Sequence, residues 1–453
     1  MNKLSTIWLS ILVVGCATDD PEDLELGDTE QAVTCPAPAI TVGRSLAVTD
    51  PAILAKFSFQ RVMNKITTTA KSTITPLQLY KDWMATWAAC GPNVDPNGYG
   101  IQCTRPESQF GSFNPFATTG ARFVPVALMN RFDLAPSSGA DCGEYRIVYA
   151  LRDRPGDRAF IIFEARLPNP RPAAGLAGCT GVADFWAKLS LDSDVASRAT
   201  KLERFYFAGI TAEGLTFSPV VTAANYGLGA TGAANGKGQI RTNFFADFTE
   251  WHLREFKLKK PCAAADACKL AMAHVTVKTN PAGELFRGTH ANTAAFEASF
   301  LNQIATLSRR NPATMAMTTQ NAHNEFESSA QAPEVVYRGF TRASFKTKIQ
   351  AKITNPNLTA NHILDRATTQ TCGGCHQHSN GADLGDGARW PSSLGFVHVD
   401  ETSNLSPALT TVFLPRRQAV LKAFLDRQCG AAAPAMESTE GLTIGGSALD
   451  APN

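Results

Sequence analysis

Apolar residues recur at helical spacing in several stretches of the chain. Leu54, Phe57, Val62 and Ile66 follow one another every three to five residues within residues 51–69, which places them on one face of an α-helix. The same kind of pattern predicts further helices over residues 76–89, 183–189, 196–208, 243–258, 292–307, 342–353 and 415–427. The last of these begins at a proline, which suits the first turn of a helix.

Two runs of β-branched and aromatic residues predict β-strands over residues 145–151 and 159–165. Pro155, Gly156 and Asp157 stand between them, so the two strands are expected to form a hairpin. A further short strand is expected over residues 334–338, and the Gly-, Pro- and Asn-rich residues 91–120 are expected to form a loop. Helices and strands do not alternate regularly, so the expected fold class is α+β.

Composition bounds the kind of protein. The chain has 453 residues, of which 44% are hydrophobic, and a formal net charge of +2. A chain of this length is enough for two domains, or for one large domain with an appended module. No run of Lys and Arg is interleaved with aromatic residues, so a nucleic-acid partner is not expected.

The first 34 residues have the features of an export signal and a tether. Lys3 is followed by an apolar run and then by Val13, Val14, Gly15 and Cys16. This resembles a bacterial lipobox, which implies that residues 1–15 are a lipoprotein signal peptide and that Cys16 carries lipid. An ordinary secretory signal is the alternative.

The lipobox resemblance also implies a location. Ala17 after the cysteine favours the outer membrane of a bacterial cell envelope, with lipid as the only membrane attachment. Residues 16–34 are acidic and poor in apolar residues, so they are expected to form a disordered tether. Residues 431–453 are rich in Ala, Gly, Ser and Pro and are expected to form a flexible tail.

The cysteines agree with an oxidising compartment. The sequence contains 11. Setting aside Cys16 and the close pair Cys372 and Cys375 leaves an even number, for which four disulfides are plausible, although sequence cannot fix the connectivity. The expected partners are Cys90 with Cys103, Cys142 with Cys179, Cys262 with Cys268, and Cys35 with Cys429.

The segment Cys372-Gly373-Gly374-Cys375-His376 has the spacing C-x-x-C-H. Two thiols at this spacing can each form a thioether to one haem vinyl group, and the adjacent histidine can ligate the iron. The segment resembles the attachment site of c-type cytochromes, and the resemblance implies one covalent haem c. The alternatives are a redox or structural disulfide between the two cysteines, or half of a zinc site.

Several residues could supply the ligand on the other side of the iron. No methionine lies between His376 and Cys429, which departs from the usual pattern of small cytochromes c. His398, flanked by apolar residues, is the favoured second ligand, and a vacant position is the alternative, as are Met315, Met317 or His362. Arg389 and Trp390 are candidates for contacts with haem propionates. His378 is too close in sequence to reach over the ring.

Other motifs carry less weight. Residues 227–232 match G-x-G-x-x-G but are not followed by a helix start, so a loop is expected. His252 is expected to be a satisfied buried histidine on the helix predicted over residues 243–258, and His323 lacks the spacing of a metal motif. Charged residues in 130–134 and 142–146 are expected to form buried Asp–Arg or Glu–Arg pairs.

Residues 130–134, 142–148 and 167–170, together with the late C-x-x-C-H, resemble uncharacterised secreted bacterial lipoproteins, a resemblance that implies no activity. The expected organisation is a disulfide-stapled α+β domain over residues 35–340 and a small, mainly helical, cytochrome c-like module over residues 341–430. The expected function is electron transfer or haem-based redox chemistry with an unknown redox partner. The alternative is a non-enzymatic surface or structural lipoprotein in which C-x-x-C-H is a disulfide or zinc clip.

Overall fold

The structure is a computed structural model that describes residues 35–89, 93–247, 250–262, 268–329 and 336–430. The predicted signal peptide, the acidic tether with Cys16, and the C-terminal tail lie outside these residues. Cys90 lies outside them as well.

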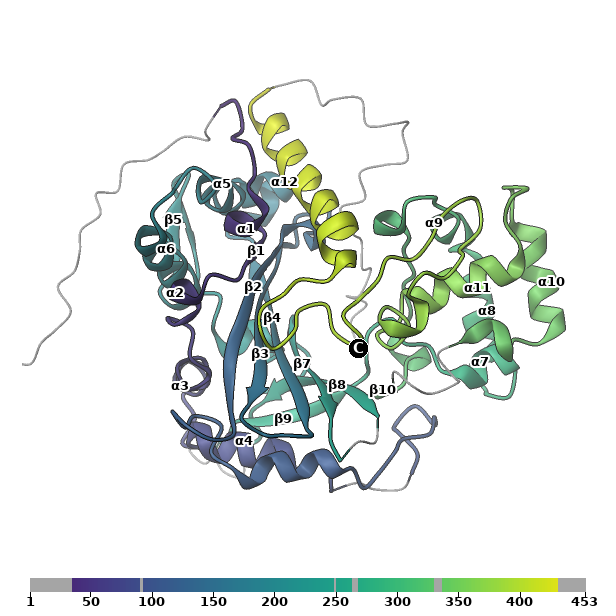
Figure 1. Cartoon of the computed structure of the whole chain (residues 1–453), viewed down its shortest axis with the longest axis horizontal. Coiled ribbons are helices and arrows are strands. Elements are labelled where there is room, and N and C mark those ends of the chain that lie inside the picture. Colours follow the sequence, from purple (N-terminus) through teal and green to yellow (C-terminus); the bar gives the residue numbers. More distant parts are fainter. Residues whose placement is uncertain (1–34, 90–92, 248–249, 263–267, 330–335, 431–453) are drawn as a thin grey trace, which may run out of the picture.

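An antiparallel sheet of eight strands forms the centre of the fold (Figure 1). Its order is β1-β2-β3-β4-β7-β8-β10, and β9 also pairs with β8. The strands are β1 (Ala47–Val48), β2 (Arg122–Arg131), β3 (Asp141–Arg152), β4 (Arg158–Pro168), β7 (Gln239–Phe245), β8 (Trp251–Lys259), β9 (Ala271–Val275) and β10 (Glu327–Ser329). A separate two-stranded sheet pairs β5 (Ile210–Ala212) with β6 (Leu215–Phe217). The predicted hairpin is confirmed as β3 and β4, which pair antiparallel.

Helices account for most of the remaining regular structure. They are α1 (Val42–Ser45), α2 (Pro51–Leu54), α3 (Phe59–Thr69), α4 (Pro76–Ala85), α5 (Thr180–Lys188), α6 (Val195–Phe207), α7 (Gly283–Arg287), α8 (Thr293–Leu301), α9 (Ile304–Leu307), α10 (Ala343–Lys352), α11 (Ala360–Thr369) and α12 (Leu414–Gln428). The helix predicted over residues 51–69 is broken into two, because the Ser58 side chain accepts the N–H of Arg61 and starts α3 afresh.

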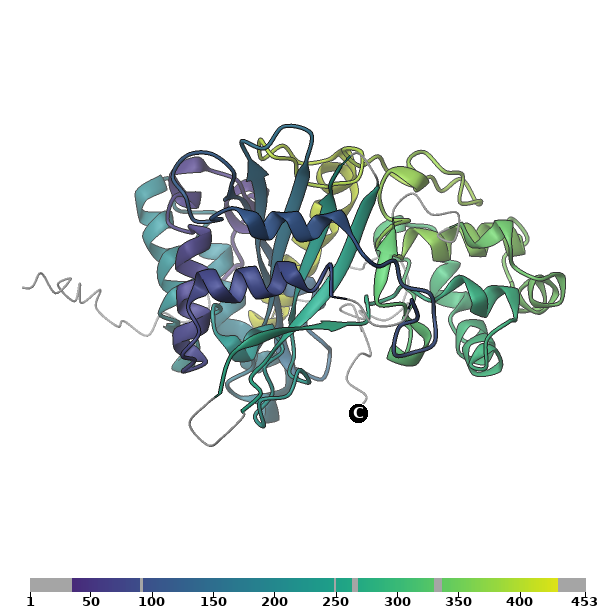
Figure 2. The ribbon, with the colours of Figure 1, turned by 90° about the horizontal axis from the view of Figure 1, so that it is seen from below.

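The two faces of the sheet differ in chemistry. One face is aromatic: Tyr145 stacks on Trp186 of α5, Tyr149 contacts Phe59 of α3, and Phe256 contacts Trp83 of α4. The opposite face carries charged residues and is covered by the chain that follows the C-x-x-C-H segment. There the side-chain amide of Asn243 in β7 donates to the Phe396 carbonyl (2.9 Å). Figure 2 shows helix α4 and the C-terminal chain on opposite sides of the sheet.

The helix predicted over residues 243–258 is wrong, because this stretch forms parts of β7 and β8. Trp251 and Leu253 point to one face of the sheet, and Phe256 and Leu258 to the other. A strand covered on both faces buries apolar residues on both sides and loses the simple alternation of a half-exposed strand. The apolar residues within 243–258 then recur at intervals that resemble those of an amphipathic helix.

Two further expectations need revision. Of the strand expected over residues 334–338, residues 334 and 335 lie outside the described chain, and Tyr337–Gly339 forms a short 3-10 turn instead. The loop expected over residues 91–120 contains the 3-10 helix Pro106–Ser112. The final helix is confirmed as α12, and a π-helical turn, Leu409–Phe413, precedes it.

The packing does not follow the domain boundary predicted at residue 340. Helices α10 and α11 share a hydrophobic core with α7, α8 and α9 through Phe286, Phe300, Ile304, Phe345 and Ile363. The later residues Val397, Leu421 and Phe424 belong to the core of the sheet. Residues 341–430 therefore divide between a helical lobe, on the right in Figure 1, and the sheet.

Disulfides link segments around the sheet. Three of the expected pairs are present: Cys35–Cys429, Cys142–Cys179 and Cys262–Cys268. Cys103 is also disulfide-bonded, while its expected partner Cys90 lies outside the described residues. Among the helices that the structure describes, none has the length and apolar character needed to cross a bilayer.

Candidate functional site

The C-x-x-C-H segment forms a tight turn directly after α11. The Thr371 side chain accepts the N–H of Gly374 (2.9 Å), and the Thr371 carbonyl accepts the N–H of Cys375 (2.9 Å). A Cβ atom on Gly374 would lie 1.9 Å from the Thr368 carbonyl oxygen, so only glycine fits there. Gly373 donates to the Ser328 hydroxyl of β10 (3.1 Å), which joins the turn to the sheet.

Cys372 and Cys375 are the free cysteines of the described chain. Both are half-buried. Burial raises the pKa of the Cys372 thiol to about 12 and that of Cys375 to about 11, although the Arg241 guanidinium acts on both in the opposite direction. Both groups are therefore neutral thiols near pH 7, held three positions apart on one turn.

Two imidazoles lie beside these thiols. The ring centroids of His376 and His398 are 4.6 Å apart, with an angle of 33° between the ring planes. His398 Nε2 lies 3.4 Å from the Cys375 sulfur, and His398 Nδ1 is hydrogen-bonded to the Ser406 hydroxyl (2.9 Å). The structure thus brings together all four residues that the sequence analysis selected in this region.

Burial sets the protonation state of both rings. It lowers the pKa of His398 to about 4 and that of His376 well below its ordinary value. Both are therefore neutral imidazoles, the form that binds metal ions. Nδ1 of His376 is buried and has no hydrogen-bond partner among the described residues, an uncommon state for a buried polar atom that calls for an explanation.

The loop that carries His398 is held by its own sequence and by the sheet. Ser406 donates its backbone N–H to the His398 carbonyl (2.9 Å), and the flanking Val397 and Val399 are buried in the core of the sheet. Phe396 lies against Trp251 of β8, with ring centroids 6.0 Å apart. His398 therefore reaches the C-x-x-C-H turn because its apolar neighbours pack on the sheet.

Other candidate ligands have different surroundings. His362 Nδ1 accepts the N–H of Thr359 in the capping box of α11, and His378 is exposed. Met317 is buried in the core of the helical lobe. Met315 lies in an apolar cluster with Leu384, Ala388 and Trp390, against which Cys375 packs. Of these four, Met315 alone shares a cluster with the motif.

The propionate-binding role considered for Arg389 and Trp390 receives no support from their contacts. The Trp390 indole N–H donates to the Cys375 carbonyl (3.0 Å), and Arg389 donates to the Gly381 carbonyl (3.2 Å). Trp390 instead fixes the backbone of the turn.

The buried pairs expected in residues 130–134 and 142–146 are confirmed, because Arg131 pairs with Asp133 and Arg146 with Glu144. The sequence analysis missed that such charges continue across the neighbouring strands and form one charged face of the sheet. Arg131 and Arg166 stand opposite Glu144, Arg146 stands opposite Glu164, and Arg241 stands opposite Glu255. Opposite charges at directly facing positions stabilise neighbouring strands. We call this set the charged floor: Arg131, Glu144, Arg146, Glu164, Arg166, Arg241 and Glu255. Charges at every second position, as in Glu144-Tyr145-Arg146 and Glu164-Ala165-Arg166, were the signal that could have revealed it.

These residues fit a covalent haem in chemical type. Two neutral thiols, a pair of neutral imidazoles and a neighbouring apolar cluster form the donor set and the surroundings that such a group requires. The two rings are close together, so an iron bound by both would require them to separate. A group of three or more His, Cys, Asp or Glu side chains suited to a metal ion does not occur among the described residues.

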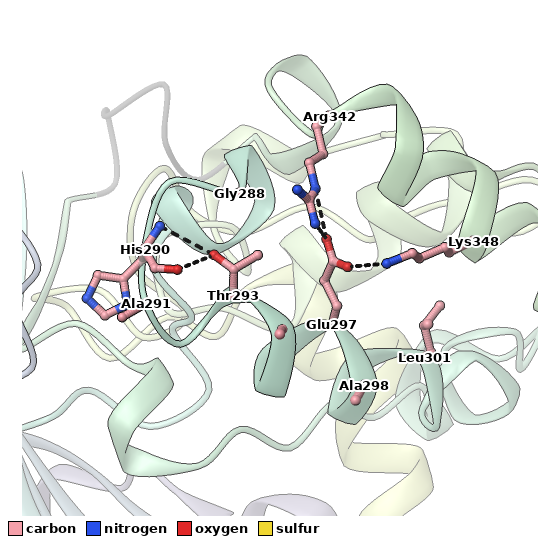
Figure 3. A pocket seen from close by; sticks show the side chains of 10 residues that line it. Gly288, His290, Ala291, Thr293, Glu297, Ala298, Leu301, Arg342 and Lys348 are labelled. Atoms are coloured by element: carbon pink, nitrogen blue, oxygen red, sulfur yellow. Dashed lines mark hydrogen bonds and ion pairs between the residues drawn. The ribbon is translucent and has the colours of Figure 1, made fainter.

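A pocket of about 530 Å³ lies elsewhere, in the helical lobe (Figure 3). Glu297 of α8 stands at its centre and accepts from both Arg342 (3.0 Å) and Lys348 (2.8 Å). These charges already satisfy one another, and none of the residues selected from the sequence lines the pocket.

Comparison with known proteins adds no assignment: no family model, curated protein or solved structure matches this chain.

Proposed function

We propose that this protein is an exported c-type haem protein in which Cys372 and Cys375 hold one haem c covalently. The observation that carries the proposal is that the free thiols of the described chain lie on one turn with the neutral imidazole of His376, and that the imidazole of His398 lies beside them. Each thiol would add across a haem vinyl group, its sulfur bonding to one vinyl carbon and its hydrogen passing to the other. The bound group would supply one-electron redox chemistry at iron.

Different residues of the chain would ligate the iron and shield the haem. His376 would be the proximal ligand, because it directly follows Cys375 in the chain. His398 would be the second ligand, in the tautomer whose Nδ1–H donates to the Ser406 hydroxyl and whose unprotonated Nε2 lies beside the Cys375 sulfur. Met315, Leu384 and Trp390 would limit the access of water to the ring. Electron transfer or haem-based redox chemistry with an unidentified redox partner follows.

The proposed location is the bacterial cell envelope, with lipid on Cys16 as the membrane attachment. The three disulfides Cys35–Cys429, Cys142–Cys179 and Cys262–Cys268 agree with an oxidising compartment. The proposal includes no nucleic-acid partner and no membrane-spanning segment.

Export of the full chain in cells with the cytochrome c assembly machinery tests the haem proposal. We expect a Soret band, and haem that stays on the chain in a denaturing gel. The control is the Cys372→Ala/Cys375→Ala variant, which should lose covalent haem while remaining folded. Wild-type chain without covalent haem under these conditions would refute the proposal. Labelling the same cells with palmitate tests the anchor, because a Cys16→Ser variant should not incorporate label.

A second candidate function is thiol–disulfide exchange by Cys372 and Cys375. The contact between His398 and Cys375 favours it, because an imidazole oriented by a hydroxyl can accept a thiol proton. The two thiols would pass two electrons and two protons to a partner disulfide and become a disulfide themselves. The raised thiol pKa values argue against a reactive thiolate. Alkylation of haem-free chain in glutathione buffers would reveal a reversible Cys372–Cys375 disulfide if this candidate is right.

A further inference from the structure

Residues 393–407 form a compact loop beside the C-x-x-C-H turn, and they include His398. The two ends of the loop meet at a neck, where the N–H of Ala408 donates to the Ser392 carbonyl (2.8 Å). Backbone bridges within the loop hold it together. A surface loop with joined ends that is packed by its own residues is an Ω-loop, and such loops frequently carry function. We call residues 393–407 the Ω-loop.

The Ω-loop covers Cys375 on one side. Nε2 of His398 lies 3.4 Å from the Cys375 sulfur, and the His398 ring lies against that of His376. On another side, Cys375 packs against the buried apolar cluster that contains Trp390. A haem vinyl group or the disulfide of a partner protein needs room at the sulfur, and His398 occupies that room while the Ω-loop is in place.

Side-chain contacts fasten the Ω-loop to the sheet. Val397 and Val399 are buried in the core of the sheet, and the Asn243 side chain donates to the Phe396 carbonyl (2.9 Å). Within the described chain, no backbone–backbone hydrogen bond joins residues 393–407 to a strand. The Ω-loop can therefore leave the sheet without breaking the hydrogen bonds between strands, which is a property of segments that open locally.

One ion pair joins the tip of the Ω-loop to β4. Glu401 accepts hydrogen bonds from Nε (2.6 Å) and Nη2 (2.9 Å) of Arg158, whose guanidinium also lies over the ring of Trp251 (4.8 Å). The paired side chains of Arg158 and Glu401 are 39% and 23% exposed. Because water reaches both groups, the pair can separate without leaving a buried charge, so its contribution to the closed position is modest.

We propose that the Ω-loop is a lid over Cys375, which opens about its neck, and that the Arg158–Glu401 ion pair is the latch that favours the closed position. Opening carries His398 away from the Cys375 sulfur and from the ring of His376. The open lid admits a haem vinyl group to the sulfur, a role that rests on the proposed function. It admits a partner disulfide equally, so the lid itself does not depend on haem.

Alkylation of the full, haem-free, reduced chain by N-ethylmaleimide tests the lid, because only the open form exposes the Cys375 sulfur to the reagent. Mass spectrometry of the peptide that contains Cys375 gives the rate at a fixed pH. Glu401→Gln should raise this rate about two- to five-fold, the factor expected when one half-exposed ion pair no longer opposes opening. The matched control is Glu203→Gln, because the Arg61–Glu203 pair between α3 and α6 has similar exposure, 40% and 26%. The control should leave the rate unchanged.

Urea separates opening of the lid from unfolding of the whole chain. Opening of the lid exposes little surface, so the alkylation rate of Cys375 should hardly change at low urea, whereas global unfolding would make it rise steeply. Equal rates in Glu401→Gln and Glu203→Gln, or a rate that follows global unfolding at every urea concentration, would overturn the proposal. A thiol that reacts as fast as in the unfolded chain would overturn it too, because the sulfur would then be uncovered. A chain that takes up no haem would defeat the proposed function but leave the alkylation result decisive.

Discussion

His398 is held from three sides beside the C-x-x-C-H turn, by the Ser406 hydroxyl, the Cys375 sulfur and the ring of His376. If it is the second iron ligand, the haem-loaded protein is low-spin. We expect His398→Ala to become high-spin and to bind carbon monoxide, because removing the imidazole opens one coordination position. Visible absorption and electron paramagnetic resonance measure both changes.

The control for this variant is His378→Ala. His378 is exposed, and its closest aromatic contact is Phe396, with ring centroids 6.3 Å apart. Its removal should leave the low-spin spectrum intact. A low-spin spectrum that persists in His398→Ala would show that another side chain, with Met315 the best placed, ligates the iron.

At the scale of elements, the sequence predicted features that depend on residues close together in the chain. It did not predict features that depend on residues far apart in the chain. Cys372, Cys375 and His376 are neighbours in the chain, so their spacing alone defined the motif. His398 was found through its apolar neighbours, which do pack on the core of the sheet. The pairing of the charged floor across the sheet was missed because it follows from the register of strands that are separated in sequence. Ser406 was missed because its contact with His398 depends on the fold of the intervening loop. The same cause misassigned residues 243–258, whose strand is covered on both faces.

The loop before β8, β8 itself and β10 share a buried ionic network, which makes the stability of the fold depend on pH. His252 Nε2 is 2.8 Å from Glu327, and Arg105 is 3.1 Å from Glu250. The interaction of Glu250 with His252, whose Nδ1 lies 3.8 Å away, is the largest influence holding the pKa of Glu250 at about 2. A lowered carboxyl pKa contributes stability above the unfolded value of about 4.5, and that stability is lost as pH falls toward 2.

We therefore expect Glu250→Gln to destabilise the protein at pH 7 by on the order of 2–3 kcal/mol, and by clearly less at pH 3. Denaturant unfolding at the two pH values measures the difference. Glu203→Gln is the control, because Glu203 forms a more exposed pair with Arg61 and should cost about 1 kcal/mol or less at either pH. A Glu250→Gln penalty that is the same at both pH values would contradict this account.

At the scale of the whole molecule, the disulfide Cys35–Cys429 joins the start of the described chain to the end of α12, 394 positions apart. Helix α12 also packs on the body of the fold through Phe424, whose ring centroid is 4.8 Å from that of Phe132, and through Gln418, which donates to the Ile40 carbonyl (2.6 Å). The chain that covers the charged face is therefore fastened at its far end by a covalent bond and by packing.

The entropy of loop closure predicts how much that bond contributes. In the chain-entropy model, closing so long a loop stabilises the fold by about 4–6 kcal/mol, whereas a loop of six residues contributes about 2 kcal/mol. We expect Cys35→Ser/Cys429→Ser to lower the free energy of unfolding more than Cys262→Ser/Cys268→Ser, which opens a disulfide with a sequence separation of 6. Cys35 and Cys262 are both exposed, so neither double variant leaves a large cavity in the core. Equal losses in the two variants would mean that packing of α12, and not the covalent bond, holds the C-terminal chain over the sheet.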